Sequence, residues 1–231
     1  MKKIIALMLI VSCMLVLGSC KIFNKGNGTQ DENDNNQTPV VIDTEAVAAI
    51  QAKIDASAPT SAEITVTLNS VLGDLVGEYN VAYNQDGSAT VDYTYEKFNS
   101  FDEANLSGEY KTVIPGTVTI AADGTVTDSI GGTAAVEAVT FSINLDTSKL
   151  ASASVSGGTL IAKVKAVDTA AVLGVSIGAD VDLAVSVGTS GVTSVSISYT
   201  TQSGPVTISA IYDYYVEVAD DTVEGGEEAA E

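Results

Sequence analysis

The alternation of apolar and polar residues after Pro59 constrains this fold more than any other feature. Val, Ile, Thr and Tyr recur there with a period of two, which is typical of β-strands that bury one face. The intervening positions carry small polar or acidic residues, as in Thr90, Asp92 and Thr94. One face of the sheet is therefore expected to be exposed to solvent and the other, the dry face, to be buried. This arrangement favours antiparallel strands.

The loops between these segments have lengths that fit hairpins, because a hairpin must place the apolar residues of both strands on one face. A three-residue loop at 85–87, with Gly87 left-handed, satisfies this condition for the first pair. An aromatic ring opposite a strand glycine can cover it. The predicted pairs are Tyr83 with Ala89, Val81 with Val91, Tyr79 with Tyr93, and Gly77 with Tyr95.

Three further hairpins follow from the same parity argument. A loop at 122–124 would set Val118 and Ile120 against Val126 and Ile130, and a loop at 189–191 would set Leu183, Val185 and Val187 against Val195 and Ile197. A four-residue turn at 202–205 would join Tyr199 to Ile208 and Val195 to Tyr212, because Pro205 cannot donate a ladder hydrogen bond. Other expected strands are 64–68, 109–113, 141–145, 152–155 and 159–166. Together they predict a meandering antiparallel sheet of about ten strands.

One amphipathic helix is expected before the sheet. Val47, Ile50 and Ile54 fall at helical spacing, Asp43 or Thr44 can cap the helix, and Pro59 stops it. A short helix is also expected at 168–173. Ten strands make a sheet roughly 48 Å wide, whereas a helix is about 10 Å across. The dry face must therefore close into a sandwich or barrel, or curl around the helix as an incomplete barrel with an apolar hollow.

The N-terminus predicts export and lipid anchoring. Lys2 and Lys3 precede an apolar stretch at 4–17, which suits a signal peptide over 1–19 and is too short to span a bilayer. The segment Leu17-Gly18-Ser19-Cys20 resembles a bacterial lipobox, in which Cys20 receives a diacylglyceryl group. The alternative is an ordinary secretory signal with Cys20 as a chance thiol. Cleavage removes Cys13, so no disulfide can form.

The mature chain then divides into three parts. Residues 20–42 hold the acylated cysteine and a polar tether of disordered character, 43–216 form the β-rich domain, and 217–231 form an acidic disordered tail. The acidic run at 31–36 lacks the glycine and closing glutamate of a calcium-binding loop. We therefore expect no metal site there. The predicted location is the extracytoplasmic face of the cell membrane.

Composition excludes several classes of function. The 231-residue chain has no His and no Arg, and its net charge is −20. Without His there is no Ser-His-Asp triad and no imidazole metal site. So acidic a chain repels nucleic acid, which is bound through clustered Lys and Arg. No cofactor is expected, and the expectation is a protein that is not an enzyme.

The order of these segments resembles the half-barrel lipoproteins related to the outer-membrane lipoprotein carrier and to lipid-carrying envelope lipoproteins. The resemblance rests on the lipobox, the tether, the helix at 45–57, the long meander, the Ala171-Val172-Leu173-Gly174 segment and a closing hairpin over 195–212. It implies a curved sheet around an apolar cavity that accepts acyl chains. The expected fold is thus mainly β, an incomplete barrel packed on one helix.

The candidate ligand-cavity residues form an aromatic and aliphatic patch on the dry face: Tyr79, Val81, Tyr83, Val91, Tyr93 and Tyr95. Two interpretations are open for them. They line a cavity for a lipid or other apolar ligand, or they pack under Val47, Ile50 and Ile54 as ordinary core.

Two other functions compete with ligand binding. A surface-display or interaction module with a filled β core would present its outer face, or Tyr212, Tyr214 and Tyr215, to a protein partner. An enzyme using only carboxylates would need two of them in a cleft, one with a raised pKa. Asp180 and Asp182 share a strand face, but an outward polar face favours solvated side chains over a catalytic pair.

Overall fold

The computed structural model describes residues 7–10, 42–123, 125–128, 138–141 and 143–214. The predicted signal peptide, except for 7–10, lies outside the described residues, as do Cys20, most of the tether and the acidic tail. Within the described part of the chain, no helix combines the length and the apolar character needed to cross a bilayer.

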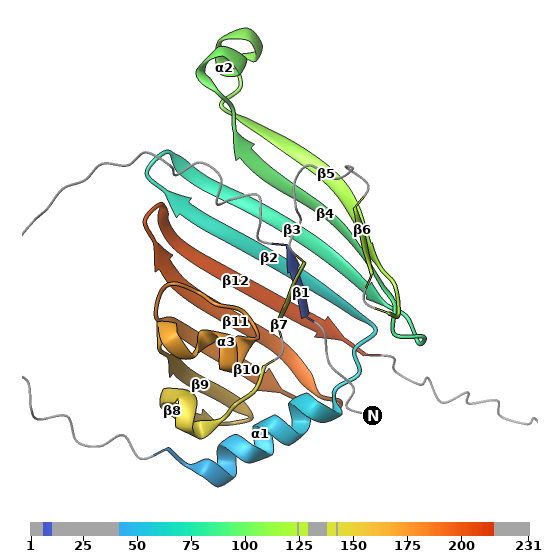
Figure 1. The fold of residues 1–231 in the computed structure, drawn as a ribbon, viewed down its shortest axis with the longest axis vertical. Helices are drawn as coiled ribbons and strands as arrows, with labels where there is room; N and C mark the ends of the chain where they lie inside the picture. The colour runs from blue at the N-terminus through green and yellow to red at the C-terminus, as the bar shows by residue number, and fades with distance from the viewer. Residues whose placement is uncertain (1–6, 11–41, 124, 129–137, 142, 215–231) are drawn as a thin grey trace, which may run out of the picture.

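A single antiparallel sheet of ten strands dominates the described residues (Figure 1). Its spatial order is β6-β5-β4-β3-β2-β12-β11-β10-β9-β8, so β6 and β8 form two free edges and the sheet does not close into a barrel. This confirms the predicted class. The strands are β2 (Ser61–Ser70), β3 (Gly73–Tyr83), β4 (Ala89–Phe98), β5 (Lys111–Ile120), β6 (Val126–Asp128), β8 (Leu150–Ser156), β9 (Thr159–Val164), β10 (Val181–Val187), β11 (Val192–Thr201) and β12 (Gly204–Asp213).

The sheet consists of two meanders joined by one pairing. Strands β2–β6 form the first, β8–β12 form the second, and β2 pairs with β12 over eight residue pairs from Val206–Leu68 to Asp213–Ser61. A separate two-stranded ladder pairs β1 (Leu7–Ile10) with β7 (Ala138–Phe141). Strand β1 falls within the predicted signal peptide, which stays a prediction.

The predicted hairpin registers are confirmed in part. Strands β3 and β4 pair as predicted, from Tyr83–Ala89 to Gly77–Tyr95, and Gly87 has φ of 87°. Ile120 pairs with Val126, but Val118 pairs with Asp128, and Ile130 lies outside the described residues.

The β10–β11 hairpin contains a bulge. Leu183–Ile197 and Val185–Val195 pair as expected. The register then shifts between Ser186 and Val187, so that Val187 pairs with Val192.

The predicted turn at 202–205 is wrong by two residues. Tyr199 pairs with Val206 and Thr201 with Gly204, which leaves a two-residue turn at 202–203. In such a turn the pair that follows the closing pair is not hydrogen-bonded across the strands. Pro205 occupies that position opposite Thr200, so its missing N–H costs the β11–β12 ladder nothing. Even parity was predicted correctly, whereas the loop length was not.

The described part of the chain has three α-helices. Helix α1 (Thr44–Ala56) begins at Asp43, whose carboxylate accepts a hydrogen bond from Ala46 N at 3.0 Å, and it packs on β8 and β10. Its buried residues are Val47, Ile50 and Ile54, as predicted. Helix α3 (Thr169–Leu173) follows a 3₁₀ turn, η2 (Ala166–Asp168). Helix α2 (Phe101–Ser107), which connects β4 to β5, was not predicted.

The predicted strand at 141–145 is also wrong beyond Phe141, where β7 ends. Asn144 N donates to Val172 O at 2.8 Å, and Leu145 N donates to Gln51 Oε1 at 2.7 Å. These backbone groups bond to α3 and α1 in place of a neighbouring strand. The segment, which continues into a 3₁₀ turn, η1 (Thr147–Lys149), thereby links both helices to the second meander.

Tyrosine rings cover two strand glycines. A Cβ at Gly116 would clash with the ring and hydroxyl of Tyr93, its partner across β4 and β5. A Cβ at Gly77 would lie 2.9 Å from the hydroxyl of Tyr79. Tyr95 was predicted to cover Gly77, but the ring of Tyr79 occupies that space.

Gly116→Ala should therefore lower the free energy of unfolding by about 1–3 kcal/mol, because Tyr93 must leave its packed position. Gly178→Ala is the matched control: no atom lies within 4 Å of its Cβ position, so a change below about 0.5 kcal/mol is expected. Urea denaturation of both variants measures the difference. Equal stabilities would contradict the close approach of Tyr93 to Gly116.

Candidate functional site

The six predicted cavity residues lie together on the buried face of β3 and β4, which we call the tyrosine face. Val91 is fully buried, Tyr93 and Tyr79 are 4% and 5% exposed, and Tyr83 and Tyr95 are partly buried. The Tyr79 and Tyr93 rings are 5.9 Å apart between centroids, and the Tyr93 and Tyr95 rings 6.2 Å. The period-two pattern therefore located these side chains correctly on one apolar face.

The tyrosine face is not the surface on which α1 mainly packs. Helix α1 contacts β8 and β10, and β10 lies five strands from β4 in the sheet. At about 4.8 Å per strand, β4 and β10 are about 24 Å apart along the sheet. The β2–β12 pairing sets the first meander at the far side of the sheet from α1. Figure 1 shows the helix along the lower edge of the sheet, away from β3 and β4.

Three tyrosines form a hydroxyl cluster at one end of this face: Tyr83, Tyr212 and Tyr214. Tyr83 N donates to Thr60 O at 2.9 Å, and Thr60 N donates to Asp213 O at 2.8 Å, which places β3, β2 and the end of β12 side by side. The hydroxyl of Tyr83 is buried and has no hydrogen-bond partner among the described residues. Burial, and then the neighbouring Tyr214, raise the pKa of Tyr83 far above its ordinary value.

Tyr212 resembles Tyr83 in its pKa, whereas Tyr214 has a hydrogen-bond partner. Burial is the main cause of the raised pKa of Tyr212, with smaller effects from Tyr83 and Tyr214. The Tyr214 hydroxyl donates to Val192 O at 2.7 Å, and Val192 N donates to Ser57 Oγ at 2.8 Å. Ser57 caps the end of α1, so this corner fastens the helix to β11. From the sequence, Tyr212 and Tyr214 had two interpretations, a contact surface for a partner or the end of the last strand; their position beside Tyr83 follows from the β2–β12 pairing.

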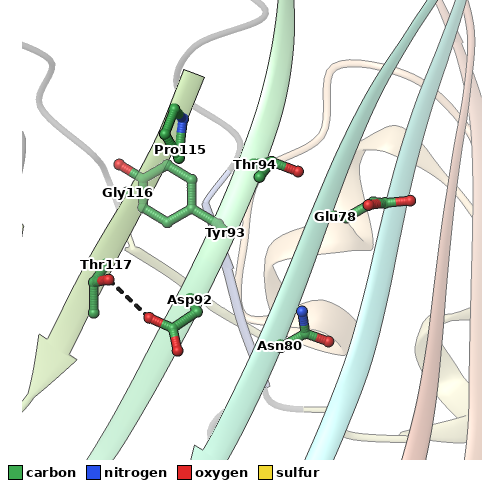
Figure 2. Close-up of a pocket in the computed structure, with 8 residues that line it drawn as sticks. All are labelled: Glu78, Asn80, Asp92, Tyr93, Thr94, Pro115, Gly116 and Thr117. Atoms are coloured by element: carbon green, nitrogen blue, oxygen red, sulfur yellow. Dashed lines mark hydrogen bonds between the residues drawn. The ribbon is translucent and has the colours of Figure 1, made fainter. Parts of the chain in front are cut away.

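The opposite face of the sheet carries two shallow hollows. Figure 2 shows the first, of about 450 Å³, where Thr117 Oγ1 donates to an Asp92 carboxylate oxygen at 2.7 Å. The second, of about 410 Å³, lies beside Asp180 and Asp182. The polar residues lining the first hollow are Glu78, Asn80, Asp92, Thr94 and Thr117.

Asp180 and Asp182 form ion pairs with lysines on this exposed face. Asp180 Oδ2 lies 2.7 Å from Lys165 Nζ, and Asp182 pairs with Lys163; both carboxylate side chains are 60% exposed. The hydrogen bond from Lys165 lowers the pKa of Asp180. A general acid needs a raised pKa, so these contacts agree with solvated, ionised side chains. Within the described ranges, no group of three or more acidic or cysteine side chains could hold a metal ion.

Comparison with known proteins assigns this chain to no family. No family model matches the sequence, and no curated protein matches it. Among solved structures, the crystal structure of LprF from Mycobacterium bovis is similar, with 12% identity and a TM-score of 0.37. The match covers 77% of this chain and 97% of that one. A likeness of this size carries no argument about function.

The hydroxyl cluster predicts two opposite mutational effects. Tyr83→Phe removes a buried hydroxyl without a partner and should raise the free energy of unfolding by about 1 kcal/mol. Tyr214→Phe, the matched control, loses its hydrogen bond to Val192 O and should lower it by a similar amount. Chemical denaturation at neutral pH measures both. A destabilised Tyr83→Phe variant would show that the hydroxyl has a partner.

The same residue predicts a dependence on alkaline pH. Burial raises the pKa of Tyr83 in the folded state, so the unfolded chain loses this proton at lower pH than the folded protein does. Stability should therefore decline as the pH rises above about 10, the ordinary tyrosine pKa. This decline should be shallower in Tyr83→Phe, which denaturation curves between neutral and strongly alkaline pH can measure.

Proposed function

We propose that this protein is a lipid-anchored, extracytoplasmic binding protein that is not an enzyme. Acylated Cys20 would hold it on the membrane, and the tyrosine face would bind a lipid acyl chain or a similar apolar molecule. The alternative is an interaction module whose buried face is ordinary filled core.

The observation that carries this proposal is that α1 and the tyrosine face lie on different strands of the sheet. Helix α1 packs on β8 and β10, whereas the tyrosine face lies on β3 and β4. The wide sheet thus has an apolar half on which its main helix does not mainly pack. Apolar surfaces flanked by a few polar groups are typical of ligand sites.

The side chains of the tyrosine face suit an acyl chain. Aromatic rings and the methyl groups of Val81 and Val91 offer apolar contact, and none of the six side chains is a carboxylate or an ammonium group. The unpartnered hydroxyl of Tyr83 supplies a hydrogen-bond donor at one end. A carboxyl or ester oxygen of the ligand would satisfy that donor, which costs free energy while it is buried alone.

Native mass spectrometry tests ligand binding directly. The secreted chain with Cys20→Ser carries no acyl anchor, so any added mass that extracts into organic solvent is a bound lipid. Tyr95→Glu places a charge on the apolar face and should reduce lipid occupancy at least tenfold. Thr94→Glu is the matched control, because the adjacent residue points to the opposite face and should leave occupancy unchanged.

Two results would contradict the proposal. The first is a mass equal to the bare chain, with no binding of added fatty acid or phospholipid. The second is an equal loss of lipid in both glutamate variants. Circular dichroism of each variant ensures that loss of lipid is not loss of fold.

The anchor has its own test. Cys20→Ala removes the thiol that would be acylated, so the protein should move from the membrane fraction to the soluble extracytoplasmic fraction. Two acyl chains hold a protein stably, at about 0.8 kcal/mol per buried CH₂. Metabolic labelling with a palmitate analogue should mark the natural chain alone. Labelling of both chains would place the acyl group elsewhere.

A further inference from the structure

Strands β4 and β5 end in a projecting tip that exposes large apolar side chains. Figure 1 shows α2 standing beyond the end of the sheet. Leu106 is 90% exposed, Tyr110 82% and Phe101 81%, and α2 buries none of its residues. Exposed apolar groups that cluster at one place on a soluble domain mark interaction sites more often than chance would.

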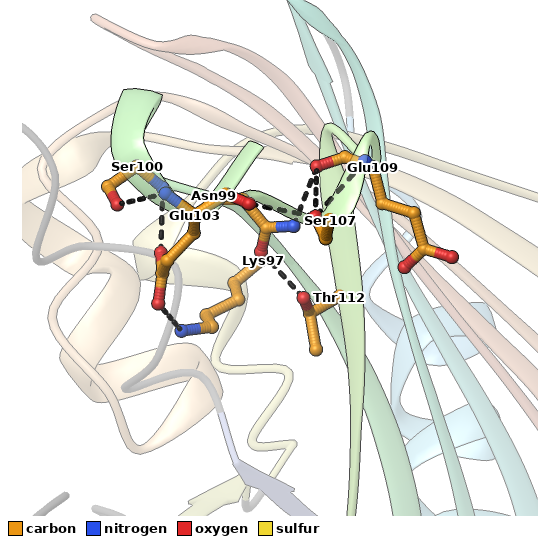
Figure 3. Close-up of polar contacts among 7 residues, drawn as sticks. All are labelled: Lys97, Asn99, Ser100, Glu103, Ser107, Glu109 and Thr112. Atoms are coloured by element: carbon orange, nitrogen blue, oxygen red, sulfur yellow. Dashed lines mark hydrogen bonds and ion pairs between the residues drawn. The ribbon is translucent and has the colours of Figure 1, made fainter. Parts of the chain in front are cut away.

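The tip is held in place by polar contacts at its base (Figure 3). Ser100 N donates to Glu103 Oε2 at 2.8 Å and Glu103 N donates to Ser100 Oγ at 3.3 Å, which forms a capping box. Asn99 Nδ2 donates to Glu109 O at 2.8 Å, and Asn99 Oδ1 accepts from Thr112 Oγ1 at 2.6 Å. A seven-residue helix is unstable alone, so these contacts fix α2 while its apolar side chains face outward.

The β2–β3 turn lies at the same end of the sheet and exposes two more apolar side chains. Val71 and Leu72 are 100% and 76% exposed. Because Gly77 pairs with Tyr95 in antiparallel strands, the start of β3 lies beside the end of β4. Lys111 Nζ bonds both Asp74 O on β3 and Glu96 Oε2 on β4, which ties the two projections together.

We propose that this apolar tip inserts into the interface of a lipid bilayer with electrically neutral headgroups. The tip comprises Val71, Leu72, Phe101, Leu106 and Tyr110. Aromatic and leucine side chains on a rigid projection suit the boundary between headgroups and acyl chains. The roughly 22 residues that link Cys20 to Asp43 span at most about 75 Å. An acyl anchor would therefore keep the tip within reach of the membrane.

Charge selects neutral over anionic lipid. Exposed Asp74, Asp102 and Glu109 lie around the tip, and the nearby lysines are already engaged. Lys97 pairs with Glu103 at 3.9 Å, and Lys111 with Glu96 at 3.2 Å. Anionic headgroups would be repelled by this acidic rim, because their binding depends on free basic side chains.

A single introduced tryptophan reports directly on insertion, because the natural chain contains no tryptophan of its own. The acylated full chain carrying Phe101→Trp is reconstituted in phosphatidylcholine vesicles, with and without brominated phosphatidylcholine. The control is Val126→Trp, on β6 at the opposite end of β5. The emission of the tryptophan at 101 should shift to the blue by several nanometres and at least halve with brominated lipid, whereas the control should change little.

Two further measurements sharpen the test. Leu106→Ser in the Phe101→Trp chain should reduce the quenching, and so should phosphatidylglycerol in place of the unbrominated phosphatidylcholine, at a constant fraction of brominated lipid. Leu106→Trp gives the same readout if circular dichroism shows that the first variant is misfolded.

The proposal is overturned if the tryptophan at 101 remains in water like the control, which would leave a protein as the occupant of the tip. Equal quenching at both positions overturns it as well, because the whole surface would then adsorb. Stronger quenching in anionic vesicles contradicts the choice of neutral lipid. None of these outcomes depends on whether the tyrosine face binds a ligand.

Discussion

The pairing of β2 with β12 is the interaction on which the rest of the domain depends. It joins two meanders from opposite ends of the domain into one sheet, with pairs such as Ile64–Ala210 and Val66–Ile208 fully or nearly buried. Each meander forms from local hairpins, whereas this ladder must close a long loop before it gains any contact. Without it, two five-stranded sheets would each leave an edge and an apolar face exposed.

The same pairing separates the apolar surface on which α1 packs from the apolar surface of the first meander. It places α1 against the second meander, where Ser57 accepts a hydrogen bond from Val192 N, and leaves the tyrosine face on the first. It also brings Tyr83 beside Tyr212 and Tyr214. The hydroxyl of Tyr83 is thus buried without a partner because of how the meanders meet, and not because of any local pattern.

Two features of the domain have no evident structural return: the buried hydroxyl of Tyr83, which costs stability, and the apolar tip at α2, whose side chains gain no burial. Sequences generally agree with their folds at every level, so departures of this kind tend to occur where function requires them. One departure lies inside the apolar face and the other at the end of the sheet. A protein that holds an apolar molecule and touches a membrane would need a site of each kind.

The sequence alone determined the class of fold, because the period-two pattern and the β3–β4 loop fix which side chains share a face. It placed α1 and all six residues of the tyrosine face correctly. The turn at 202–203 was mispredicted because parity cannot distinguish a two-residue from a four-residue turn. Helix α2 was missed although Ser100 and Glu103 have the spacing of a capping box. Only the tertiary structure decided that α1 packs on β8 and β10 and not mainly on β3 and β4, since which strands meet across the sheet depends on contacts between residues distant in sequence.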